Sequence, residues 1–82
     1  METPILNRLT GTTPSDLLEQ YMNAVRAVKA AGTAMSGVWP HARDYQGGSI
    51  NVAMHEHAER CRALTKVAGE LQIIVDALTS QI

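Results

Sequence analysis

The chain has 82 residues, with seven Lys and Arg against eight Asp and Glu and a formal net charge of -1. A chain of this length forms one domain at most and buries only about 60% of the surface that its unfolded form exposes, so help from a metal, a disulfide or other subunits is expected. The near-neutral charge argues against general nucleic-acid binding through phosphate neutralisation.

The expected location is the cytoplasm, without membrane contact. The single cysteine, Cys61, cannot form an intramolecular disulfide, and no apolar run approaches the roughly 18 residues that indicate a membrane span. The opening residues, Met1 to Pro4, lack the basic residues and the apolar stretch of a secretory signal.

Residues 1–12 are predicted to form a short arm, followed by a first helix over residues 13–39. Thr13 can cap this helix, Pro14 has its φ preset for the first helical position, and Asp16 lies near the positive end of the helix dipole. Seam residues then recur at alternating spacings of three and four: Leu18, Tyr21, Val25, Val28, Gly32, Met35 and Trp39.

Pro40 ends this helix, and residues 40–49 carry the turn residues of an irregular loop. Ser49 or Asn51 can cap a second helix over residues 50–82. The same alternation returns there without a break, at Ile50, Met54, His57, Cys61, Leu64, Ala68, Leu71, Val75, Leu78 and Ile82.

Two seams joined by a short loop predict an all-α fold, an antiparallel two-helix hairpin of coiled-coil type that forms a single domain over residues 1–82. No strand pattern competes with this interpretation. Gly32, among alanines, is expected to let the two backbones approach closely near the loop.

The second helix carries a further apolar row, Val67 and Ile74 with the flanking Ile73, beside its seam. One partner helix cannot cover a stripe this wide, which favours a homo-oligomer. Its predicted interface is Val67, Leu71, Ile74, Val75 and Leu78. In the alternative interpretation, Ile5, Leu6 and Leu9 of the arm fold back over the row.

The loop carries the side chains best suited to binding a ligand. Arg43 can donate two hydrogen bonds to a phosphate or carboxylate, Tyr45 can stack on a base, and Gln46 can hydrogen-bond to a base edge. The alternative is an internally bonded loop, with Arg43 paired to Asp44 and Tyr45 packed near Trp39. The candidate ligand-binding residues are His41, Arg43, Asp44, Tyr45, Gln46, His57 and Arg60.

His57 and Cys61 are four residues apart, a spacing that can chelate zinc, but they supply only two ligands. We therefore predict no metal site, with Cys61 as a small buried residue. His57 stands at a seam position and needs hydrogen-bond partners if buried. It is either a core histidine bonded to Tyr45 or Asp44, or a ligand contact where the seam opens.

Residues 26–66 hold six basic residues against three acidic ones, so positive charge concentrates in the middle of the chain. The pairs Glu56–Arg60 and Glu59–Arg62 can neutralise part of it, and a solvated charged face is favoured over a dedicated anion site. No nucleophile elbow, phosphate-binding glycine loop, paired CxxC or HExxH motif is present, so no enzyme and no cofactor are predicted.

The second half of the chain resembles a set of small phage-encoded helical-hairpin proteins that share a Pro-His-x-Arg-Asp-Tyr loop followed by a helix with Glu-His, Arg and spaced leucines. The matching residues here are Pro40, His41, Arg43, Asp44, Tyr45, Glu56, His57, Arg60, Leu64, Glu70, Leu71 and Ile74. Family members continue with a second aromatic residue, whereas this chain has Gln46. The architecture is also similar, more loosely, to phage proteins that sequester cyclic nucleotide immune signals.

Two functions follow as hypotheses. In the first, a phage-type anti-defence protein sequesters a small anionic, cyclic nucleotide between the subunits of a homo-oligomer, without catalysis. In the second, the protein binds a host defence complex through its exposed apolar helical stripe and acts as its inhibitor or as an adaptor. Neither hypothesis involves a membrane.

Overall fold

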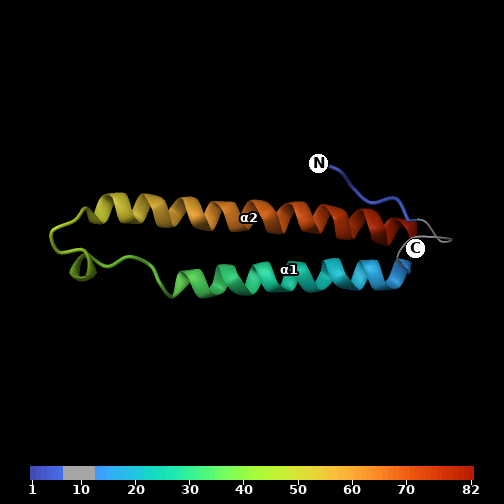
Figure 1. The fold of residues 1–82 in the computed structure, drawn as a ribbon, viewed down its shortest axis with the longest axis horizontal. Helices are drawn as coiled ribbons and strands as arrows, with labels where there is room; N and C mark the ends of the chain where they lie inside the picture. Colours follow the sequence, from blue (N-terminus) through green and yellow to red (C-terminus); the bar gives the residue numbers. More distant parts are fainter. Residues whose placement is uncertain (7–12) are drawn as a thin grey trace.

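The fold is a helical hairpin (Figure 1). The computed structural model describes residues 1–6 and 13–82. Two helices, α1 (Pro14–Ser36) and α2 (Ile50–Gln81), run antiparallel and pack against each other, and a short 3-10 helix, η1 (Ala42–Asp44), lies in the loop between them. No strand occurs among the described residues. The predicted all-α hairpin is therefore confirmed.

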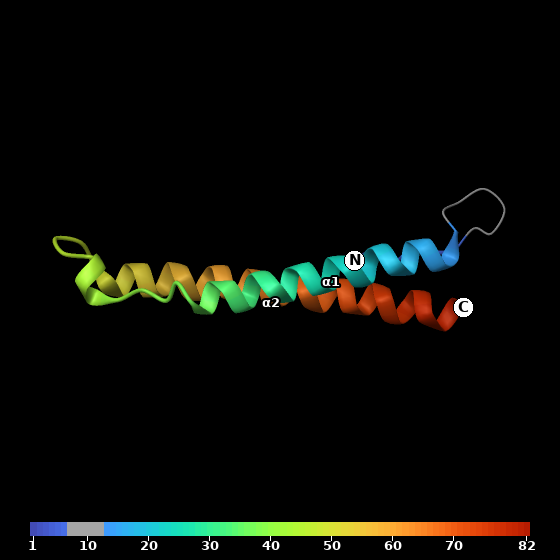
Figure 2. The ribbon, with the colours of Figure 1, turned by 90° about the horizontal axis from the view of Figure 1, so that it is seen from below.

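The hairpin is long and thin. Its extents are 60 × 20 × 18 Å, and its radius of gyration is 17.9 Å. A compact domain of this length has a radius of gyration of about 12 Å. Figure 2 shows that the two helices cross and separate toward the C-terminal end of α2. Among residues 1–6 and 13–82, no further α-helix packs beside them.

Helix α1 begins as predicted and ends early. Pro14 is at its start and Asp16 lies in its first turn, but the Thr13 side chain makes no capping hydrogen bond. The last helical residue is Ser36, so the predicted end at residue 39 is wrong. The cause is Pro40, whose ring disfavours helical backbone at the residue before it and blocks the turn that precedes it.

Helix α2 begins at Ile50 as predicted and ends at Gln81, one residue before the predicted end. The Ser49 hydroxyl accepts a hydrogen bond from the Val52 amide at 3.2 Å, which confirms Ser49 as the cap, while Asn51 lies inside the helix. A capping serine of this kind stabilises a helix by about 1 kcal/mol.

The predicted seam is the contact between the helices. Most of its residues are buried or half-buried, and the exceptions are Trp39, Met54 and Ile82, which lie toward the ends of the hairpin. The most deeply buried apolar residues are Val25 of α1 and Ile74, Val75 and Leu78 of α2. The core is therefore concentrated in the half of the hairpin farther from the loop.

Gly32 does not mediate the close approach that the sequence suggested. A Cβ atom at this position would meet nothing within 4 Å. Gly32 instead lines a groove of about 490 Å³ between the helices, together with Val28, Leu64 and Ala68. The missing side chain of Gly32 therefore leaves open space between the helices.

The N-terminal segment, residues 1–6, returns along α2 on the side away from α1 (Figure 1). The Leu6 amide donates to Gln81 Oε1 at 3.0 Å, and Gln81 Nε2 donates to the Pro4 carbonyl at 3.1 Å. Of the three residues expected in the alternative interpretation to cover α2, Leu6 is half-buried, Ile5 is exposed, and Leu9 lies outside the described residues.

Two glycine substitutions test this description. Gly32→Ala is expected to raise the free energy of unfolding by about 0.5 to 1 kcal/mol, because alanine favours helix and the space is free. Gly47→Ala is the matched opposite case, since Gly47 has a φ of 83°; it is expected to cost about 1 to 2 kcal/mol. Urea unfolding followed by circular dichroism measures both, and destabilisation by Gly32→Ala would mean that the helices are closer than described.

Candidate functional site

The predicted loop residues form an exposed, hydrogen-bonded turn at the tip of the hairpin. The Asp44 amide donates to the His41 carbonyl at 3.0 Å, the Tyr45 amide to Ala42 at 3.1 Å, and the Gly48 amide to Tyr45 at 3.1 Å. These backbone bonds fix the loop without help from side chains. All of His41, Arg43, Asp44, Tyr45 and Gln46 are exposed.

The side chain of Arg43 has no hydrogen bond or ion pair with any other residue in the described part of the chain. The expected pairing with Asp44 is therefore not formed. Tyr45 is 39% exposed, and no ring contact joins it to Trp39. A guanidinium and a phenol are thus both available to solvent, and a guanidinium can donate two parallel hydrogen bonds to a phosphate or a carboxylate.

His57 lies inside the hairpin, with only 2% of its surface exposed. Its ring meets Trp39 edge to face, with ring centroids 4.7 Å apart, and its Nε2 lies 3.5 Å from Cys61 Sγ. Tyr45 and Asp44, the expected partners, are not bonded to it. His57 is therefore a core residue that holds the chain between α1 and the loop against α2.

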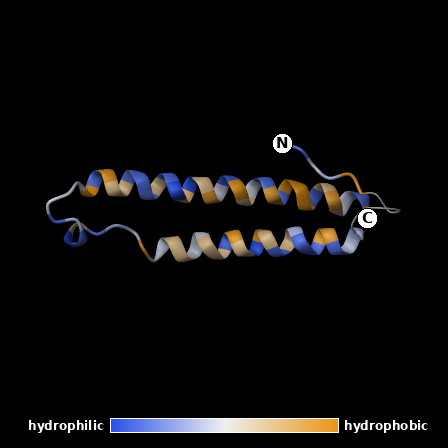
Figure 3. Ribbon diagram, viewed as in Figure 1, coloured by the Kyte–Doolittle hydropathy of each residue, from blue (hydrophilic) through white to orange (hydrophobic). Residues whose placement is uncertain are grey.

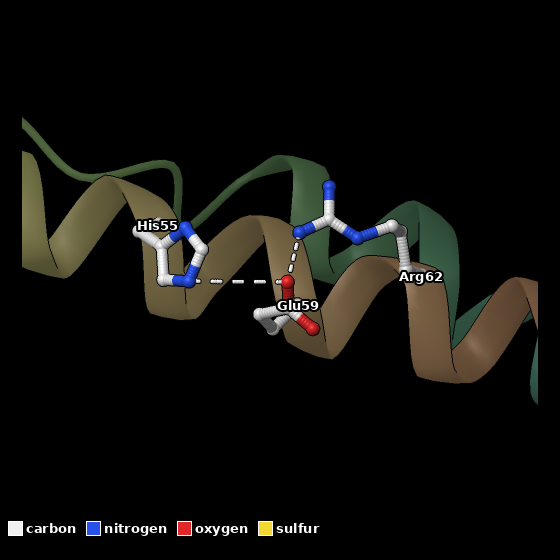
Figure 4. Close-up of polar contacts among 3 residues, drawn as sticks. All are labelled: His55, Glu59 and Arg62. Carbon is white, nitrogen blue, oxygen red and sulfur yellow. Dashed lines mark hydrogen bonds and ion pairs between the residues drawn. The ribbon is translucent and has the colours of Figure 1, made fainter.

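Arg60 and its neighbours form ion pairs on the outer surface of α2. Arg60 pairs with Glu56 at 3.7 Å, and Arg62 pairs with Glu59, as the sequence predicted. Figure 4 shows Glu59 between Arg62 and His55, whose Nε2 lies 3.9 Å away. The hydrogen bond from Arg62 and then its charge lower the pKa of Glu59 below its usual value, with a smaller contribution from His55. These charges form a solvated face.

The predicted ligand-binding residues are consequently not brought together. The five loop residues are at the tip, His57 is enclosed behind Trp39, and Arg60 is paired with Glu56 at the surface. Over residues 1–6 and 13–82, no group of three or more His, Cys, Asp or Glu is placed to hold a metal ion. The loop can offer single hydrogen-bonding and stacking groups to a ligand, but it does not enclose one.

The predicted oligomer interface divides in two. Ile74, Val75 and Leu78 are buried within the single chain, and Leu71 is half-buried. They belong to the core of the hairpin, where α1 packs against α2. Only Val67, at 43% exposure, offers a largely free apolar side chain to another molecule.

Two contacts that matter for the structure are not predicted from the sequence, those of Trp39 with His57 and of Gln81 with the N-terminal segment. Trp39 was expected in the first helix, but it reaches His57 from the segment after the helix. The heptad alternation that runs through residue 39 was the signal for this contact. Gln81 was passed over because it is a polar residue off the seam, yet it binds both Pro4 and Leu6.

Neither described helix is long and apolar enough to cross a membrane. Comparison with protein-family models, with curated proteins and with solved structures finds no match to this chain. The function must therefore be argued from the surface of the hairpin itself.

Substitution of His57 tests whether it is a core residue or a ligand contact. His57→Ala is expected to lower the free energy of unfolding by about 2 kcal/mol, because it leaves a cavity beneath Trp39. It should also shift the fluorescence of Trp39 to longer wavelength. Arg60→Ala, on the same helix but exposed, is expected to change stability by less than about 0.5 kcal/mol. Equal stability losses in the two variants would contradict the core role of His57.

Proposed function

We propose that this protein is a non-catalytic binding module that associates with itself and docks on another protein through its apolar helical surface. The observation that carries the proposal is the area that the single chain leaves uncovered. Its solvent-accessible surface is 5939 Å² for a mass of 8.9 kDa. A compact protein of that mass exposes about 4,800 Å², so the surplus is about 1,100 Å².

This surplus is of the size that stable protein interfaces cover. A symmetric dimer that covered about 1,100 Å² on each subunit would bury about 2,200 Å² in all, within the range of obligate homodimers. The uncovered surface also includes large apolar residues in the C-terminal half of α2, Val67 and Ile73. Figure 3 shows that strongly hydrophobic residues gather in the C-terminal half of α2. Exposed apolar residues along one side of a helix suit contact with another helix.

The partner class rests on the resemblance rather than on the surface. The loop from Pro40 to Tyr45 resembles that of phage-encoded hairpins, which points to a host defence complex in the cytoplasm as the target. In a reducing cytoplasm the free thiol of Cys61 would remain unpaired. We propose inhibition or bridging of that complex by a homo-oligomer, without a cofactor.

Val67→Asp tests the proposal. A charge at this exposed position should leave the hairpin folded but weaken self-association by at least about tenfold, because an unpaired carboxylate would enter the interface. Val52→Asp, at a valine near the loop that is more exposed than Val67, is the matched control and should have little effect. Sedimentation equilibrium measures both. Wild-type protein that stays monomeric at millimolar concentration would refute self-association.

A second candidate function is favoured by one observation, the free guanidinium of Arg43 beside the exposed ring of Tyr45. We propose as the alternative that the tip captures a small anionic nucleotide, as a sequestering protein would. Arg43 would meet a phosphate, Tyr45 would stack on a base, and subunits would have to bring two tips together to enclose the ligand.

Calorimetry against cyclic di- and trinucleotides separates the two candidates. Nucleotide binding predicts heat at micromolar concentration that Arg43→Ala abolishes, since the guanidinium supplies the phosphate contact. Asp44→Ala should keep that heat, because a carboxylate does not attract an anion. Absence of heat from folded wild-type protein would exclude this alternative and leave the protein-binding candidate untouched.

A further inference from the structure

The burial of Ile74 is unexpected for its place on α2. Val75 faces α1, and Ile74, one residue earlier, points about 100° away around the helix. Val67 is in the equivalent position one heptad earlier on the same stripe. Val67 is 43% exposed, whereas Ile74 is only 8% exposed. We attribute this difference in exposure to a cover that lies only near the C-terminal end of α2.

The N-terminal segment is at that end. Gln81, one heptad after Ile74 on the same stripe, holds the segment by both atoms of its side-chain amide, one bonded to Leu6 and the other to Pro4. Pro4 and Leu6 are half-buried, while Ile5 between them is 89% exposed. This alternation is that of an extended strand, which lays every second side chain on the helix.

We propose that residues 1–6 are an intramolecular latch that covers the C-terminal part of the α2 stripe, and that its release opens the stripe to a second copy of the chain. This inference rests on the proposed self-association. The segment separates the covered part of the stripe, at Ile74, from the open part at Val67. Without it, Val67 and Ile74 would form one continuous row, spaced as a helix of another subunit requires.

The contacts that hold the latch on α2 are weak enough to allow its release. Its described polar contacts to α2 are the two hydrogen bonds of Gln81, which lie at a partly solvent-accessible helix end where water competes with them. Its apolar contribution comes from two half-buried side chains, Pro4 and Leu6. A helix of a second copy would cover Ile74 together with Val67 and would therefore bury more apolar surface than the latch does.

Two pairs of variants in the full chain test the latch. Gln81→Ala removes both hydrogen bonds, and Leu6→Ala removes the inserted side chain. Their matched controls are Gln72→Ala, an exposed glutamine on the same helix that bonds Asp76, and Ile5→Ala, whose side chain points to solvent. Amide hydrogen exchange at residue 6, binding of a hydrophobic dye and sedimentation equilibrium are measured for all four.

Gln81→Ala and Leu6→Ala are expected to speed exchange at the residue 6 amide and to raise dye binding. Each should strengthen self-association by about tenfold, as expected when one further isoleucine becomes available per subunit. The two controls should match the wild type. Circular dichroism verifies that each variant keeps its helices.

The latch and the proposed function can fail separately. Unchanged exchange at residue 6 in Gln81→Ala, relative to Gln72→Ala, would overturn the latch. Faster exchange without stronger association, in a protein whose association Val67→Asp abolishes, would overturn its regulatory role. If Val67→Asp has no effect on association, the proposed self-association fails, and the exchange and dye measurements still decide whether the segment covers the stripe.

Discussion

Two helices that pack side by side can cover only one stripe of each other, and this limit governs the whole structure. Helix α1 covers the α2 seam around Val75 and Leu78, and Val25 completes the core from its own side. In the described part of the chain, no further α-helix packs on the long faces of this hairpin. Apolar residues outside the seam must therefore be covered by another part of the chain or by another molecule.

The contacts outside the helix pair differ between the two ends of the hairpin. At the loop end, α1 stops at Ser36 and the chain continues as a less regular segment that sets Trp39 against His57. A contact between the exposed Trp39 ring and the buried His57 ring thus takes the place of the missing turn of helix. At the other end, two hydrogen bonds of Gln81 join the N-terminal segment to α2, and Ile74, one heptad before Gln81, is buried. Between these ends the groove beside Gly32 and the side chain of Val67 remain open.

The distribution of polar groups also bears on function. Charged residues near the loop end of α2 pair with one another along the same helix, as Arg60 does with Glu56. Such exposed pairs add little to stability and leave little net charge to attract a ligand. Arg43 differs from them because it has no partner among the described residues. A surface with paired charges and open apolar rows suits a protein partner better than a polyanion.

The sequence alone determined the two helices, their antiparallel arrangement, a cap at Ser49 or Asn51 and the seam, because heptad spacing and capping chemistry are local properties of the chain. It also predicted the ion pairs of Glu56 and Glu59, which need only helical spacing. Tertiary structure decided the rest. The partner of His57, the open space at Gly32 and the cover over Ile74 depend on segments distant in sequence, whose approach follows from packing of the whole chain.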